Sequence, residues 1–204
     1  MFSAVRRTPA FILVLLAPAI GTAAAFAQKP STQSPTPAAP ATAPPNAPKI
    51  EDQPSFTVVG LTVRTNNAAE AGGQGKIGQL WQAAVQNATL EQIPNIVGDG
   101  YVVVYSNYAS DHTGDYDYTL GYRVSSVGKV PEGMVVRTIR AGKYAVFTSE
   151  AGPPQQIIPD LWKHINSLTP EQQGGERAYQ TDFELYPAIT DWSSIQITAH
   201  IGLK

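Results

Sequence analysis

The order strand, helix, strand, strand occurs twice along this chain, and this order constrains the fold more than any other feature. In the first half, the β-branched residues of 56–64 predict a strand. A set of apolar residues at helical spacing follows: Ile77, Leu80, Trp81, Ala84 and Val85. Two stretches rich in valine and tyrosine, 101–108 and 116–124, then predict a pair of strands around a loop.

The second half repeats this order. Residues 134–140 and 143–148 predict strands on either side of a turn. The helix predicted after the two prolines at 153–154 carries its own apolar set: Ile158, Leu161, Trp162, Ile165 and Leu168. Residues 179–186 and 195–203 predict the last two strands.

Residue matches between the halves indicate a tandem duplication of one βαββ unit. The matching residues are Leu80-Trp81 with Leu161-Trp162, and Tyr101, Tyr105 and Tyr108 with Tyr179, Phe183 and Tyr186. Chance matches between strands of similar composition are the alternative. The predicted fold class is therefore α+β, with two βαββ units, an antiparallel sheet and a pseudo-twofold axis. Clefts between such halves are favoured places for small-molecule sites.

The strand around Glu184 places a carboxylate among aromatic residues. Period-two alternation predicts one face made of Gln180, Asp182, Glu184 and Tyr186, and the opposite face made of Tyr179, Thr181, Phe183 and Leu185. A carboxylate beside aromatic rings suits an organic cation, because the charge supplies attraction and the rings supply dispersion and a quadrupole. A solvent-facing Glu184 is the alternative, since charged residues are mostly exposed. Between the aligned halves Glu184 corresponds to Ser106, so the acid breaks the symmetry.

The N-terminus has the pattern of a secretory signal peptide. Arg6 and Arg7 precede an apolar run at 11–17, and small residues ending in Ala25-Phe26-Ala27 give an A-x-A cleavage site. The apolar run is too short for a good transmembrane helix, although an uncleaved anchor is the alternative. We therefore expect residues 1–27 to be removed and the mature protein to be periplasmic or secreted, with no transmembrane segment after cleavage.

Composition divides the rest of the chain into two parts. Residues 28–54 consist mainly of Pro, Ala, Thr and Ser, which predicts a disordered linker because such a segment buries too little apolar surface to offset its ordering entropy. Residues 55–204 are enough for one domain with a sizeable core. The sequence thus predicts a signal peptide, a linker and one folded domain.

Several classes of function find no support in the composition. The chain has no cysteine, so it has neither disulfides nor thiolate metal sites, and its formal net charge of −2 gives no electrostatic footprint for nucleic acid. The acidic loop at 110–117 lacks the ligand spacing of a calcium site, and its Asp and Gly residues are good turn formers. His164 and His200 have no recognisable Ser nucleophile. We expect no metal, no cofactor, no catalytic residues and no nucleic-acid partner.

Several motifs together resemble a known family, the GyrI-like, AraC-type effector-binding domains, and above all its integron-associated, cationic-drug-binding branch. The motifs are 61–67, Leu80-Trp81, 104–108, 110–117 and 177–186. The resemblance implies a tandem βαββ fold whose central pocket binds lipophilic, often cationic, molecules, with Glu184 as the pocket carboxylate. The chain departs from the family in its signal peptide and Pro-rich linker, and it has no DNA-binding segment.

The residues expected in the ligand pocket are Glu184, Tyr186, Tyr108, Tyr116 and Trp81. Strand alternation or loop position turns the tyrosines toward Glu184, whereas a large aromatic such as Trp81 on an apolar helix face is also typical of a core. We expect a non-enzymatic, exported small-molecule-binding protein. Two alternatives use the same domain: a hydrolase of strained electrophilic natural products with Glu184 as acid or base, and an envelope-tethered sensor module. Ligand identity and oligomeric state stay open.

Overall fold

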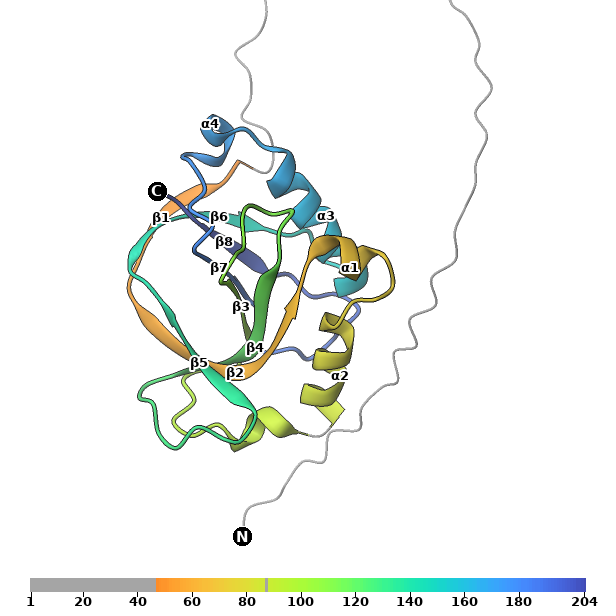
Figure 1. Ribbon diagram of the computed structural model, residues 1–204, viewed down its shortest axis with the longest axis vertical. Coiled ribbons are helices and arrows are strands. Elements are labelled where there is room, and N and C mark those ends of the chain that lie inside the picture. The colour runs from red at the N-terminus through yellow and green to blue at the C-terminus, as the bar shows by residue number, and fades with distance from the viewer. Residues whose placement is uncertain (1–46, 87) are drawn as a thin grey trace, which may run out of the picture. The chain divides into compact units, whose positions relative to one another are not determined.

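A computed structural model describes residues 47–86 and 88–204 of the protein (Figure 1). Its strands are β1 Lys49–Gln53, β2 Phe56–Thr65, β3 Val102–Ser106, β4 Tyr116–Val124, β5 Met134–Ile139, β6 Gly142–Thr148, β7 Thr181–Leu185 and β8 Thr198–Gly202. Its helices are α1 Asn67–Ala71, α2 Ile77–Gln86, the 3-10 turn η1 Thr89–Gln92, α3 Pro154–Ser167 and α4 Pro170–Gln173. Within these ranges no helix is long and apolar enough to cross a membrane.

The strands form one antiparallel sheet whose order is symmetric about its centre. The order is β1-β6-β8-β7-β3-β4-β2-β5, so β3 and β7 form the central pair. Outward from this pair, β4 and β2 on one side match β8 and β6 on the other, and the longest helix of each side, α2 or α3, lies in the connection between two of its strands. The edge strands come from the opposite halves, because β1 pairs with β6 and β5 pairs with β2. This confirms the predicted α+β class and the βαββ order, whereas the duplication of sequence stays a prediction.

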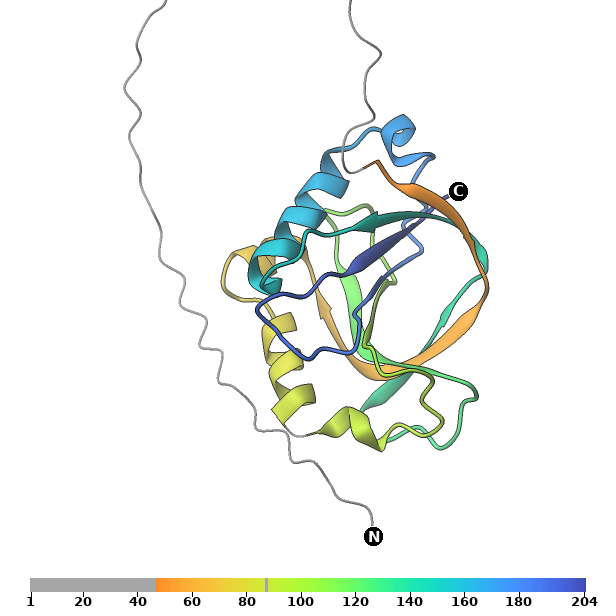
Figure 2. The same ribbon diagram turned by 180° about the vertical axis from the view of Figure 1, so that it is seen from behind.

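The two faces of the sheet have different coverings. In both views α2 and α3 lie along one side of the sheet, and the edge strands curl away on the other side (Figures 1 and 2). The helix side holds the larger cluster, in which Leu80 of α2 and Leu161 of α3 pack with Val103 and Tyr105 of β3. The opposite side holds a smaller cluster: Val58, Val102, Val104, Ile139, Tyr144 and Phe183. Strand alternation therefore sends every second residue of β3 and β7 toward the helices.

Two facing glycines let the neighbouring strands β2 and β4 approach closely. Gly60 pairs directly with Gly121. A Cβ added to Gly60 would lie 2.2 Å from the carbonyl oxygen of Leu120, and one added to Gly121 would lie 2.0 Å from that of Val59. These contacts are far below van der Waals distance, so side chains at this pair would push the strands apart.

The predicted linker is wrong at its C-terminal end. Residues 49–53, expected to be disordered, form β1 and pair with β6 in a continuous register from Lys49↔Val146 to Gln53↔Gly142. Ile50 is the single large apolar residue of this strand, and it is 42% exposed. Strand β1 is held by backbone hydrogen bonds to the edge of β6. Such bonds do not depend on the side chains, so they leave no hydrophobic pattern in the sequence. The ordered domain therefore begins by Lys49, while residues 1–46, with the predicted signal peptide, lie outside the described residues.

The register of the central pair also corrects the alignment of Glu184 with Ser106. Ser106 pairs with Thr181, whereas Glu184 pairs with Val103. Directly paired residues share a face, and Thr181 and Glu184 are an odd number of residues apart, so Ser106 and Glu184 point to opposite faces. The match of Ser106 with Glu184 between the two halves is therefore wrong, because the two residues lie on opposite faces of the sheet. The two halves still differ in charge, because Glu184 is present in one of them, but Ser106 is not the residue that corresponds to Glu184.

Candidate ligand-binding site

Glu184 lies on the helix side of the sheet and has no exposed surface (0%). Three neutral groups donate hydrogen bonds to its carboxylate. The hydroxyl of Tyr105 (3.0 Å) and the indole Nε1 of Trp162 (2.5 Å) donate to Oε1, and the hydroxyl of Tyr186 (2.9 Å) donates to Oε2. Because Tyr105 belongs to β3 and Trp162 to α3, the carboxylate joins the two central strands to one of the covering helices.

Six aromatic side chains enclose this carboxylate, and we call them the aromatic cage: Trp81, Tyr105, Tyr116, Tyr118, Trp162 and Tyr186. The ring of Tyr105 lies at its centre, with centroids 4.8 Å from Trp162, 5.2 Å from Tyr118 and 5.4 Å from Tyr116. Trp81 closes the α2 side, where its Nε1 donates to the Tyr118 hydroxyl at 2.7 Å and its ring lies 5.2 Å from Tyr186. The cage therefore draws on both helices and the central strands.

The electrostatics of the cage follow from burial. Burial raises the pKa of Glu184, and the three donors oppose this rise without cancelling it. Burial and the nearby Glu184 charge raise the pKa of Tyr105 well above its ordinary value, so this hydroxyl stays protonated and able to donate. In the part of the chain that the structure describes, no Lys, Arg or His forms an ion pair with Glu184. The ionised carboxylate thus has hydrogen bonds but no counter-charge.

A second buried carboxylate, Asp182, lies two residues before Glu184 on the same face and is fully neutralised. Its Oδ2 accepts hydrogen bonds from Nη2 (2.7 Å) and Nε (3.1 Å) of Arg177 and from the hydroxyl of Tyr108 (2.7 Å). Its Oδ1 accepts from the backbone N–H of Gly202 at 2.9 Å. Asp182 is 0% and Arg177 is 5% exposed, so this ion pair is buried.

The guanidinium of Arg177 lies among aromatic faces of its own. Its central carbon is 4.5 Å from the ring centroid of Tyr179, 5.4 Å from that of Trp162 and 5.7 Å from that of Tyr108. Its Nη1 also donates to Oδ1 of Asn166 at 2.9 Å. Trp162 therefore links the two carboxylates, since its ring faces Arg177 and its N–H bonds to Glu184.

The structure brings the five expected site residues into one region, but they have different contacts. The hydroxyl of Tyr186 donates directly to Glu184, whereas Trp81 contacts the ring of Tyr186 and donates to the hydroxyl of Tyr118. The hydroxyl of Tyr108 bonds to Asp182, and the hydroxyl of Tyr116 donates to Oδ1 of Asn67 at 2.9 Å. Tyr108 and Tyr116 thus lie beside the aromatic cage or in its wall without touching the Glu184 carboxylate through a hydrogen bond.

Five further residues complete the site and were not among the predicted ligand contacts: Tyr105, Tyr118, Trp162, Arg177 and Asp182. Alternation along 177–186 placed Asp182 on the Glu184 face, which was an available signal for a second carboxylate. The spacing of α3 identified Trp162 as an apolar-face residue, and nothing in that spacing indicates that its N–H reaches a strand. The arginine was not linked to the site because it lies before the strand begins.

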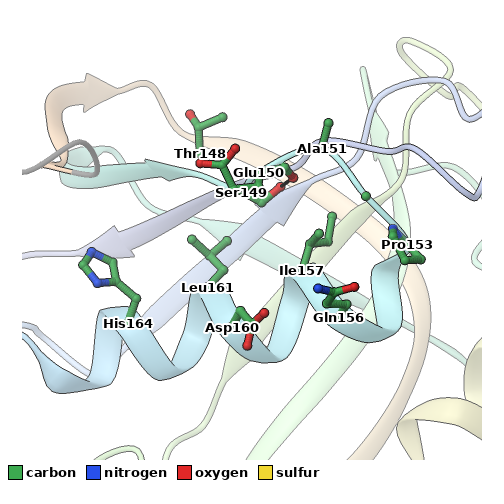
Figure 3. A pocket seen from close by; sticks show the side chains of 11 residues that line it. Thr148, Ser149, Glu150, Ala151, Pro153, Gln156, Ile157, Asp160, Leu161 and His164 are labelled. Atoms are coloured by element: carbon green, nitrogen blue, oxygen red, sulfur yellow. Dashed lines mark hydrogen bonds between the residues drawn. The ribbon is translucent and has the colours of Figure 1, made fainter.

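The Glu184 carboxylate is covered by the side chains around it, since the residue is 0% exposed. One cavity of about 230 Å³ lies between α3 and the segment after β6, where Ile157 and Leu161 point toward Ser149 (Figure 3). Another of about 330 Å³ is lined by Phe56 and Arg123 among others. None of the five expected site residues lines either cavity. A ligand that reaches Glu184 must therefore displace aromatic rings of the cage.

The acidic loop at 110–117 has the contacts of a turn. Oδ1 of Asp111 accepts from the backbone N–H (2.8 Å) and the hydroxyl (2.7 Å) of Thr113, two residues later. Asp117 binds Arg64 and Arg137. Among the residues at 47–86 and 88–204, no group of three or more His, Cys, Asp or Glu could hold a metal ion.

Residues 49–199 match the family described as integron-associated effector binding protein. The transcriptional regulator BrlR of Pseudomonas aeruginosa is 32% identical over 139 residues, which cover 68% of this chain and 47% of BrlR. The chain therefore spans about half the length of this relative.

Solved structures share the fold. An integron cassette protein of Vibrio cholerae is 28% identical, with a TM-score of 0.63 over 78% of this chain and 97% of that one. The structure of SAV2435 bound to tetraphenylphosphonium has a TM-score of 0.62 at 19% identity, over 77% of this chain and 93% of that one. At that identity the likeness to SAV2435 concerns the fold alone.

Proposed function

The chain belongs to the integron-associated effector binding protein family, and from this premise we propose that it binds lipophilic organic cations in the aromatic cage, with Glu184 as their counter-charge. Effector binding is the property of the family; the charge of the ligand and the role of Glu184 are our inference. We propose accordingly that the protein is a ligand-binding domain rather than an enzyme.

The observation that carries this proposal is the state of Glu184. A carboxylate with 0% exposure and three neutral donors keeps its hydrogen bonds on burial but has no compensating charge. Its pKa is raised by that burial. A cationic ligand beside it would supply the missing charge in a medium of low dielectric constant, where the attraction is stronger than in water.

The surrounding rings suit the same class of ligand. Cations bind to the faces of Trp and Tyr through the ring quadrupole, and apolar substituents gain dispersion and burial from them. The cage provides two indole and four phenol rings: Trp81, Trp162, Tyr105, Tyr116, Tyr118 and Tyr186. Delocalised aromatic cations, which lose little hydration on burial, fit this surface better than a small, strongly hydrated ammonium ion.

Binding requires the cage to open. The Trp162 indole is half-buried on α3, and Tyr186 lies just beyond the end of β7. Rotation of either ring would break its hydrogen bond to Glu184 and give a ligand access to the carboxylate. Tryptophan fluorescence is therefore expected to respond to ligand.

Titration of tetraphenylphosphonium against the wild type and Glu184→Gln tests the proposal. We expect at least about a tenfold weaker affinity in the variant, since removing one buried charge from an ion pair costs more than about 1.4 kcal/mol. Glu132→Gln is the matched control, because Glu132 is exposed and distant in sequence from the cage. Equal affinities for the wild type and Glu184→Gln would remove Glu184 from the site. Turnover of a strained electrophile that depends on Glu184 would instead favour the hydrolase.

We also propose that binding takes place outside the cytoplasm, on the strength of the charged, apolar and A-x-A segments at 1–27. The following Pro-rich segment would then tether or space the domain from the membrane or a partner. The mass of the protein isolated from its own cells tests this. A mature chain beginning at Gln28 is expected, and an intact N-terminus in the cytoplasmic fraction would contradict export.

A further inference from the structure

We propose that Arg177 leaves the site with a single unneutralised carboxylate and so makes it selective for monocations over dications. This rests on the proposed function, because it concerns the charge of the ligand in the same cage. Arg177 acts here as a specificity-determining residue: it need not touch the ligand, but it occupies the place that a second ligand charge would need.

Two carboxylates lie side by side under the helices. Asp182 and Glu184 both have 0% exposure and project from the same face of β7, about 7 Å apart along the strand. Without a cation of the protein's own, this arrangement would attract a ligand with two positive charges at that spacing. The chain supplies such a cation at one of the two positions.

The Arg177 guanidinium pairs with Asp182 at one of these two positions. It makes two bonds to Oδ2 of Asp182, at 2.7 and 3.1 Å, the hydroxyl of Tyr108 donates to the same oxygen, and the N–H of Gly202 donates to Oδ1. The charge of Asp182 is therefore balanced within the protein. The aromatic ring of Tyr179 covers the guanidinium at 4.5 Å. An internal cation thus already sits in an aromatic and acidic setting of the kind that a ligand cation requires.

Trp162 places this internal cation next to the ligand position. One side of its indole faces the Arg177 carbon at 5.4 Å, and its N–H bonds to Glu184. A monocation beside Glu184 restores neutrality to the site. A second positive charge directed along β7 would lie beside the guanidinium instead of a free carboxylate. Like charges within about 7 Å of each other in a protein medium repel strongly enough to reduce affinity by tenfold or more.

A pair of probes with similar shape and different charge tests this selectivity. The monocation is the para-phenyl derivative of N-methylpyridinium, and the dication is methyl viologen, in which a second N-methylpyridinium replaces the phenyl ring. The wild type is expected to prefer the monocation. In Arg177→Met, which leaves Asp182 without its cation, the ratio of dication to monocation affinity is expected to rise by at least about tenfold.

Two variants separate charge from packing. Arg177→Met with Asp182→Asn removes both charges of the pair and should keep the monocation preference of the wild type, because Glu184 alone remains. Asp182→Asn alone leaves Arg177 uncompensated, and it should weaken binding of both probes, the dication more. Binding is compared only among variants whose near-ultraviolet circular dichroism matches the wild type.

The outcomes distinguish this inference from the proposed function. Binding of neither probe nor tetraphenylphosphonium by the wild type would overturn both. Binding with an unchanged affinity ratio in Arg177→Met would overturn the role of Arg177 and leave the cation site in place. If Arg177→Met does not fold, the other two variants decide: a dication preference in the double variant, or unchanged affinities in Asp182→Asn, overturns the inference.

Discussion

Replacing Asp182 by Asn leaves the Arg177 guanidinium buried without its carboxylate. We expect this change to lower the free energy of unfolding of the protein. Both partners are almost inaccessible, with side-chain exposures of 4% for Arg177 and 0% for Asp182. Asparagine keeps the shape and can still accept from the N–H of Gly202 and donate to the hydroxyl of Tyr108. The change therefore removes the charge of Asp182 while it preserves most of the local packing.

The expected loss is about 3 to 5 kcal/mol of unfolding free energy, because breaking a buried ion pair leaves an uncompensated charge. This is a large part of the 5 to 15 kcal/mol that holds a typical domain folded. Arg177→Met should cost a similar amount. The double variant should be more stable than the sum of the single losses predicts, by about 2 kcal/mol, because it has no unpaired charge left.

Urea unfolding followed by tryptophan fluorescence and circular dichroism measures these losses. An exposed pair gives the matched control: Glu176 and Lys204 have side-chain exposures of 64% and 58%, and Glu176→Gln should change stability by less than about 1 kcal/mol. Additive losses in the double variant, or a loss below about 1 kcal/mol in Asp182→Asn, would refute the view that this pair neutralises a buried charge.

Further predictions concern other parts of the domain. Burial lowers the pKa of His200 from its ordinary value near 6.5 to about 4, so the folded state favours the neutral imidazole. The stability that this gives is present above pH 6.5 and is lost as the pH falls through about 4. His200→Gln should flatten the stability profile in that window, as measured by thermal melts at several pH values; an unchanged profile would contradict this. Gly121→Ala should destabilise the protein by about 1 to 3 kcal/mol in chemical denaturation, because its Cβ would lie 2.0 Å from the Val59 carbonyl oxygen. A neutral substitution would show that β2 and β4 can separate at this point.

The sequence was sufficient for the fold where side-chain patterns dominate. Helical spacing located α2 and α3, and β-branched and aromatic runs located β2 to β8, because each of these elements buries a face against the core. It failed at β1, whose five residues owe their place to backbone pairing with β6. Backbone hydrogen bonds are the same for every residue, so an edge strand held mainly by them has almost no pattern to detect.

The residues of the candidate site likewise could be predicted only in part from the sequence. Alternation placed Glu184 and Tyr186 together, since both belong to one strand and its end. The contributions of Tyr105 and Trp162 depend on how β3, β7 and α3 lie against one another, which local spacing does not contain. The match of Glu184 with Ser106 was wrong because a shift by an odd number of residues exchanges the two faces of a strand, and the pattern of aromatic residues did not fix the shift.

The pH dependence of tetraphenylphosphonium affinity tests the central claim most directly. Because burial raises the pKa of Glu184, a fraction of the carboxyl is protonated at pH values where an exposed Glu is fully ionised. The charge of tetraphenylphosphonium does not change with pH, so its affinity should rise as the pH rises through the folded-state pKa of Glu184 and then reach a plateau. Calorimetric titration of the wild type and Glu184→Gln over this range should show the rise in the wild type and a weak, flat profile in the variant. Equal, pH-independent affinities in the two proteins would contradict a cation site built on Glu184.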